Sequence, residues 1–147
     1  LNLEEIELNY LMERITNIDA DLLQGKSLTF VPIENDFMIN VDRFHFENAI
    51  NNIIDNAIKY GGDSIIVSLN KMNSEAIISI KDNGNELTKS QSSQIFDKFY
   101  RVPKGNTHNV KGFGIGLYYT KNIIEKHRGT ISVDTTNGVE FLIKLPN

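Results

Sequence analysis

The sequence predicts an α+β fold, an α/β sandwich in which helices pack on one face of a sheet. Two patterns predict it: apolar residues recur at helical spacing in some segments, and β-branched runs bounded by polar turns form others. The two kinds of segment interleave along 147 residues, a length typical of one domain. We therefore expect residues 1–147 to form a single domain. Because the chain begins at Leu1 rather than Met, we also expect it to be a piece of a longer protein.

Helices are predicted in four segments. The clearest spans residues 43–60 and ends at Gly61-Gly62, because glycines stop a helix. Its apolar face consists of Phe46, Ile50, Ile53, Ile54 and Ala57. Shorter or weaker patterns predict the other helices over residues 3–18, 89–97 and 117–127.

Six segments rich in β-branched residues are predicted to be strands. They are residues 27–33, 36–41, 64–70, 75–81, 130–135 and 139–145. The third and fourth form a hairpin through Met72-Asn73-Ser74, and the last two join through Thr136-Asn137-Gly138. Residues 101–116 hold four of the ten glycines and are predicted to be a loop.

Composition narrows the classes of function. The chain has no cysteine, which excludes disulfides and thiolate metal sites, and its three histidines show no metal-ligand spacing. The net charge of −4 argues against nucleic-acid binding. No apolar run reaches the roughly 18 residues of a membrane span. We therefore expect a globular domain without nucleic-acid or direct membrane contact.

One stretch departs from the acidic balance. Between Lys98 and Ile124 there are five cationic residues and no acidic ones, a net charge of +5. Since the whole chain has a net charge of −4, the rest of it carries −9. Within it, Gly112-Phe113-Gly114-Ile115-Gly116 follows Lys111 and precedes a predicted helix. Exposed N–H groups at a helix start bind phosphate, so the cluster indicates either a phosphate site or a flexible loop. Its spacing is not that of a dinucleotide fingerprint.

Gly25-Lys26-Ser27 matches the end of a P-loop, but Ala20 stands where the first glycine of that motif belongs. A predicted helix precedes it and a predicted strand follows, which is the reverse of a P-loop. The motif therefore predicts a helix stop followed by a strand start.

Two polar features suggest ligand contacts. Asn52 and Asn56 lie one turn apart on the polar face of the helix 43–60, beside Lys59, although asparagine is a poor helix former. Amide oxygens suit Mg²⁺ and lysine suits phosphate, but a plain solvated face is the alternative. Asp82-Asn83-Gly84 ends a strand and indicates either a turn or a carboxylate that binds a base.

Taken in order, four motifs resemble those of sensor histidine kinases. They are the N box at 52–60, the first glycine box at 82–84, the F box at 95–101 and the second glycine box at 112–117. The resemblance extends over nearly the whole chain. It implies the ATP-binding catalytic domain, a Bergerat-type fold with a mixed, mostly antiparallel sheet shared with gyrase, the ninety-kilodalton heat-shock chaperone and mismatch-repair ATPases.

The resemblance also implies roles for individual residues. Asn56 would hold Mg²⁺ with support from Asn52, and Asp82 would accept a hydrogen bond from the adenine amino group. The catalytic residues would be Asn52, Lys59 and Arg101. Residues 102–111 would form a lid anchored by Phe96 and Phe99. The residues expected to contact ATP are Asn52, Asn56, Lys59, Tyr60, Asp82, Gly84, Phe99, Lys111, Gly112, Gly114, Ile115, Gly116 and Leu117.

The implied activity is transfer of the γ-phosphoryl group of Mg-ATP to a histidine on a separate helical dimerisation domain of the same kinase. A response regulator receiver domain would act downstream in two-component signalling. The chain would be the cytoplasmic part of a larger, membrane-anchored or unanchored sensor. No phosphoacceptor box surrounds any of the three histidines.

Two alternatives stay open at this point. An ATP hydrolase of the gyrase type carries a glutamate in the N box, and the matching position here is Asn52. A degenerate nucleotide-binding scaffold is favoured by Glu86, where the first glycine box normally has a second glycine. It is also favoured by Val139, where the family's last strand pair normally carries a hydroxyl.

Overall fold

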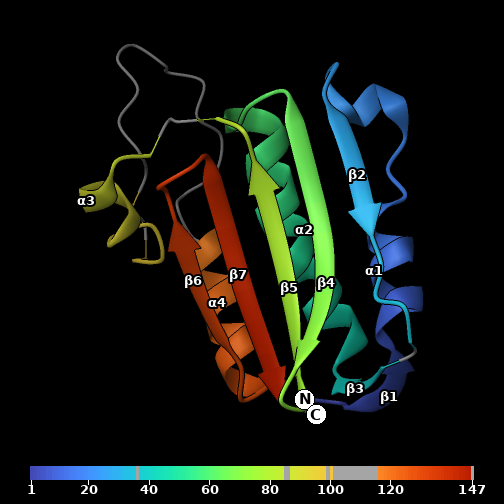
Figure 1. Cartoon of the computed structure of the whole chain (residues 1–147). Coiled ribbons are helices and arrows are strands. Elements are labelled where there is room, and N and C mark those ends of the chain that lie inside the picture. The colour runs from blue at the N-terminus through green and yellow to red at the C-terminus, as the bar shows by residue number, and fades with distance from the viewer. Residues whose placement is uncertain (36, 85–86, 99, 101–115, 147) are drawn as a thin grey trace.

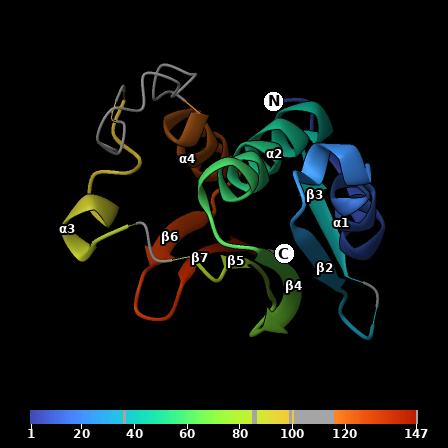
Figure 2. The same cartoon turned by 90° about the horizontal axis from the view of Figure 1, so that it is seen from above.

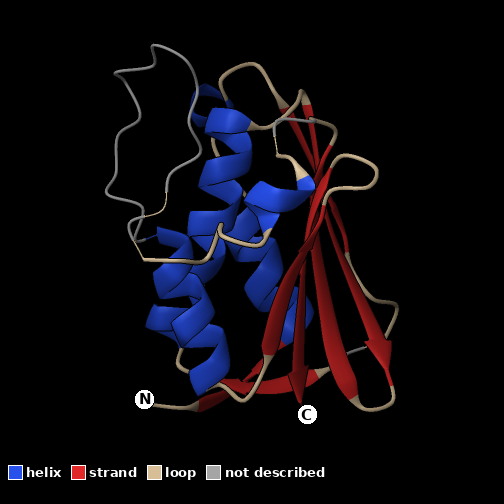
Figure 3. Cartoon of the chain, turned by 90° about the vertical axis from the view of Figure 1, so that its left-hand side faces the viewer, coloured by secondary structure: helices blue, strands red, loops and turns tan. Residues whose placement is uncertain are grey.

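The computed structural model describes residues 1–35, 37–84, 87–98, 100 and 116–146. Three helices lie side by side on one face of a five-stranded sheet (Figures 2 and 3). They are α1 (Leu8–Thr16), α2 (Arg43–Tyr60) and α4 (Gly116–Lys126). The predicted sandwich of helices on one sheet face is confirmed. None of the described helices combines the length and apolar character needed to cross a bilayer.

The sheet is mixed and mostly antiparallel, as predicted (Figure 1). Its strand order is β2-β4-β5-β7-β6, and only the pair β2 and β4 runs parallel. The five strands are β2 (Ser27–Val31), β4 (Ser64–Met72), β5 (Glu75–Asp82), β6 (Thr130–Asp134) and β7 (Val139–Pro146). A separate two-stranded sheet pairs β1 (Glu4–Glu7) with β3 (Met38–Val41), and the short helices are η1 (Ala20–Leu23) and α3 (Lys89–Ser92).

The core lies between the helices and one face of the sheet. All five residues of the apolar face predicted for α2 are buried, none more than 6% exposed. Along β5, every second residue from Ala76 to Asp82 is buried, because successive side chains of a strand point to opposite faces. The central helix and the central strands therefore share one apolar layer.

The N-terminal segment differs from its prediction. Residues 3–18 have helical periodicity, but Glu4–Glu7 form β1, and α1 begins only at Leu8. The physical reason is pairing with β3, where Ile6 lies opposite Ile39 and both side chains are buried. This contact, far along the chain, outweighs local helix preference, which is weak for so short a segment.

The helix predicted over residues 89–97 is also shorter than expected. It is a single turn, α3, opened by a capping box in which Thr88 and Gln91 bond each other's backbone N–H. Hydrogen-bonded turns follow as far as Tyr100. Of the loop predicted over 101–116, residues 101–115 lie outside the described residues, and Gly116 is the first residue of α4.

Asp42 joins three parts of the chain at the N-terminal end of α2. Its Oδ1 accepts from His45 N (3.2 Å) as the N-cap, and its Oδ2 accepts from Asn2 N (2.8 Å). Its own N–H donates to His127 Nε2 (2.9 Å) just beyond α4. Because Nε2 accepts, the buried His127 ring is neutral and donates from Nδ1 to Ile123 O (2.7 Å).

These contacts of Asp42 predict that part of the stability of the fold is lost in acid. The N–H of Asn2, followed by that of His45, lowers the pKa of Asp42 from 3.8 to about 2. A carboxyl with a lowered folded pKa stabilises the fold above its unfolded pKa, and this contribution is lost as pH falls through the folded pKa. Asp42→Asn should therefore lower stability at neutral pH, and its difference from wild type should vanish as pH falls from about 4 to about 2.

Urea unfolding between about pH 6 and about pH 2 measures this difference. Asn51→Ala, at an exposed position of α2 that does not titrate, is the control and should keep a constant difference from wild type. An Asp42→Asn difference that is the same at every pH would contradict the assignment.

Candidate functional site

The carboxylate of Asp82 lies at the centre of the candidate site. It ends β5 beside the end of α2, and the residue is only 6% exposed. Its Oδ1 accepts hydrogen bonds from Gly84 N (2.7 Å) and Gly62 N (3.1 Å). Within the described residues, Oδ2 receives no hydrogen bond. Asp82 can therefore offer one fixed acceptor oxygen to a ligand.

Glycines give the carboxylate its room. A Cβ at Gly61 would stand 2.6 Å from Asp82 Oδ2, and one at Gly84 would stand 2.8 Å from Oδ1. Gly138, at φ +83°, places its backbone against Asp82 O. Because a real side chain cannot approach so closely, the Asp82 carboxylate packs against bare backbone at Gly61 and Gly84, and the Asp82 carbonyl does so at Gly138.

Sequence reasoning placed Asp82 and Gly84 in the site but interpreted Gly61-Gly62 only as a helix stop and Gly138 only as a turn. The structure brings Gly61 and Gly62 to the carboxylate, and it brings Gly138 to the backbone carbonyl of Asp82. A glycine pair directly after the polar-faced helix was the available signal for the first two.

A stripe of asparagines runs along α2 at intervals of four residues. Asn48 lies beside Tyr119 of α4, and Asn52 Nδ2 donates to Gly116 O (3.2 Å), the first residue of α4. The helices are antiparallel here, since Thr120 Oγ1 donates back to Ala49 O (2.9 Å). Asn56 therefore lies one turn of α2 beyond the start of α4, where the unpaired N–H groups of a helix are found.

The residues around Asn56 differ in exposure and in their contacts. Lys59 Nζ lies 2.8 Å from Asp55 Oδ2, and that hydrogen bond raises the pKa of Lys59. The two side chains are 42% and 56% exposed, and an exposed pair contributes less than about 1 kcal/mol, so Lys59 can exchange Asp55 for another anion. Tyr60 is half-buried, whereas the side chain of Leu117 is buried in the core and leaves only its backbone for a ligand.

Phe96, expected to anchor a lid, packs edge-on against Phe141 of β7, with ring centroids 6.0 Å apart. Several other predicted site residues lie outside the described residues: Phe99, Arg101, Lys111, Gly112, Gly114 and Ile115. Among the residues described, no three His, Asp or Glu side chains gather in a way that could hold a metal ion.

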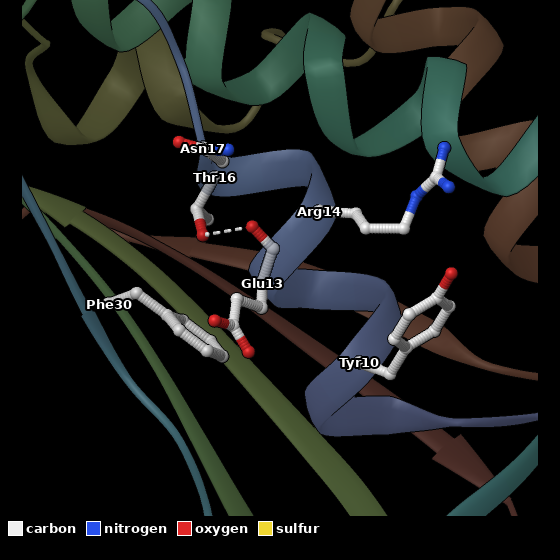
Figure 4. A pocket seen from close by; sticks show the side chains of 6 residues that line it. All are labelled: Tyr10, Glu13, Arg14, Thr16, Asn17 and Phe30. Carbon is white, nitrogen blue, oxygen red and sulfur yellow. Dashed lines mark hydrogen bonds between the residues drawn. The ribbon is translucent and has the colours of Figure 1, made fainter.

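A separate hollow of about 660 Å³ lies beside α1 and β2 (Figure 4). It is lined by Tyr10, Glu13, Arg14, Thr16, Asn17 and Phe30. The Arg14 guanidinium lies 5.9 Å from the centre of the Tyr10 ring and lowers the pKa of that phenol. No predicted site residue lines this hollow.

Comparison with known proteins agrees with the four motifs. Residues 41–147 match the family described as histidine kinase-, DNA gyrase B- and HSP90-like ATPases. The sensor protein RprX of Bacteroides fragilis is 37% identical over an alignment that covers 99% of this chain and 30% of that protein. The sensor protein SrrB of Staphylococcus aureus is 38% identical, with 71% of this chain and 19% of that protein covered. The chain thus spans under a third of the length of these relatives.

Solved structures support the same fold. The nucleotide-free catalytic domain of the histidine kinase ThkA superposes with a TM-score of 0.84 and 24% identity over 99% of this chain and 96% of that one. The mycobacterial sensor histidine kinase MprB gives a TM-score of 0.82 at 21% identity, covering 99% of this chain and 97% of that chain. The family model matches most of the chain, and the relatives reported above are sensor proteins. The chain therefore belongs to the family of histidine kinase-, DNA gyrase B- and HSP90-like ATPases.

Proposed function

We propose that this chain binds Mg-ATP as the catalytic module of a sensor kinase and transfers the γ-phosphoryl group to a histidine on a separate dimerisation domain. The observation that carries the proposal is the buried Asp82 carboxylate, with one oxygen held by two amides and the other left as an acceptor. A response regulator receiver domain would be the downstream partner.

The purine end of the nucleotide belongs at Asp82. A lone acceptor oxygen suits an amino group, as on adenine, and repels a carbonyl oxygen, as on guanine. Burial strengthens this preference for adenine over guanine, because a polar group that is buried without a hydrogen-bond partner costs free energy. The glycines around Asp82 let a flat ring approach.

The phosphate end belongs at the start of α4. From Asn52 to Tyr60, α2 spans roughly 12 Å, so it can lie along a nucleotide from phosphates to base. Asn56 would hold Mg²⁺ together with phosphate oxygens and water, the usual mode for this ion, and Asn52 would support it. The other residues that would contact ATP, as the resemblance implies, are Lys59, Tyr60, Gly84, Phe99, Lys111, Gly112, Gly114, Ile115, Gly116 and Leu117.

Transfer is favoured over hydrolysis by Asn52. Its amide is no general base, and its Nδ2 is already engaged with Gly116 O. In the proposed reaction a ring nitrogen of the partner histidine attacks the γ-phosphorus. The bond to the bridging oxygen breaks, and ADP leaves with the electron pair. Arg101 and Lys59 would neutralise charge on the phosphates.

Asp82→Asn tests the purine contact. The variant keeps the shape but loses the charge of the acceptor, so ATP affinity should fall about 10- to 150-fold. Isothermal titration calorimetry measures it, with Asp134→Asn, at an exposed position ending β6, as the matched control. Equal affinity of Asp82→Asn and wild type would refute the purine assignment.

Asn56→Ala tests the metal contact. With EDTA, variant and wild type should bind ATP alike. With Mg²⁺, the gain in affinity should be about tenfold smaller in the variant, the equivalent of one lost contact of ~1.4 kcal/mol. Asn51→Ala, an exposed asparagine on the same helix, should behave as wild type. The proposed role of Asn56 fails if both variants respond equally to Mg²⁺.

The chain alone, incubated with labelled ATP, should neither phosphorylate itself nor release phosphate rapidly. His127 is buried with both ring nitrogens bonded, and His45 Nδ1 lies 3.1 Å from Asp42 Oδ1. Adding a dimerisation domain with a phosphoacceptor histidine should produce label on that domain. Label mapped to His45, His108 or His127 would contradict the proposal, and rapid phosphate release would favour the hydrolase alternative.

A further inference from the structure

The connector between α2 and β4, residues 61–63, together with Ser64 at the start of β4, divides its backbone groups between two neighbours. On one side, the N–H groups of Gly62 and Ser64 donate to the side chains of Asp82 (3.1 Å) and Asn83 (3.0 Å). On the other side, the carbonyls of Gly61 and Asp63 accept from Lys26 Nζ (2.9 Å) and Ser27 N (2.9 Å). The connector is thus held from both sides.

Lys26 also closes the end of α2. Its Nζ lies 3.3 Å from Ala57 O, in addition to its bond to Gly61 O. Ala57 O also accepts from Gly61 N (2.9 Å), and the C-terminal end of a helix carries partial negative charge, so the ammonium group adds charge-assisted hydrogen bonds there. The lysine of the Gly25-Lys26-Ser27 motif therefore caps the C-terminal end of α2 by donating to backbone carbonyls.

We propose that Lys26 is a positioning residue for purine selection, which rests on the nucleotide-binding function proposed above. Gly61 and Gly62 have no side chains to fix the connector, and glycine explores more backbone conformations than other residues. Lys26 holds the carbonyl of Gly61, so it fixes the direction of the next N–H, that of Gly62. That N–H orients Asp82 Oδ1, and with it the oxygen that meets the base. Lys26 itself touches no ligand.

The test uses the ratio of two nucleotide affinities. Inosine diphosphate carries a carbonyl where ADP carries the amino group, so the preference for ADP reports the placement of Asp82. In Lys26→Met, which keeps the aliphatic stem but loses the donors, ADP affinity should fall about 5- to 20-fold. Inosine diphosphate and Mg-tripolyphosphate should bind nearly as in wild type. Lys26→Arg should restore most of the preference.

Lys144→Met is the matched control, an exposed lysine on β7 opposite Ile77, five residues before Asp82 on β5. It should leave all three affinities unchanged. A merely structural loss in Lys26→Met would weaken every ligand together or none. If Lys26→Met does not fold, Lys26→Gln, which keeps a neutral amide donor but loses the positive charge, takes its place with the same expected direction.

Amide hydrogen exchange on the nucleotide-free protein supplies an independent reading. The N–H groups of Gly62 and Ser64 should exchange faster in Lys26→Met than in wild type or Lys144→Met. Wild-type chain that binds no ADP would refute the proposed function, and this inference with it. Wild-type chain that binds ADP, with the preference and the exchange unchanged in Lys26→Met, would overturn this inference alone.

Discussion

The pair of hydrogen bonds from Gly62 N and Gly84 N to one oxygen of Asp82 is the interaction on which the site depends. It joins the segment after α2 to the segment after β5, so a helix and a central strand meet at one carboxylate. The bonds give two donors to one oxygen of a side chain that is almost fully buried. They also explain why glycines surround it, since any side chain there would displace either the carboxylate or the backbone that holds it.

The other end of the site depends on how α2 and α4 pack. Asn52 and Thr120 each donate to a backbone carbonyl of the opposite helix, which sets where α4 begins along α2. The buried apolar face of α2 fixes the same helix against the sheet. The two faces of α2 therefore act together. The apolar face fixes how the helix packs on the sheet, and the polar face fixes where α4 begins beside it.

The sequence predicted most reliably what local patterns determine. The helix over residues 43–60 was predicted to the residue, because its apolar periodicity and the glycine pair that follows it agree. β1 was not predictable, because it exists only through pairing with β3, more than thirty residues further on. The motifs indicated Asp82 and Gly84 as neighbours, but not the role of Gly138 or of Lys26. Those contacts join segments distant in sequence, and a single sequence carries no local sign of them.

Both ends of α2 are tied to aspartates, Asp42 at its start and Asp82 just past its end. The helix has 18 residues, which is about five whole turns, so its two ends face the same side. One inserted residue would rotate the far end by about 100° and advance it by about 1.5 Å. Only one tether could then be kept. The helix thus behaves as a strut of fixed length, in which an insertion or deletion would break one of the two ties.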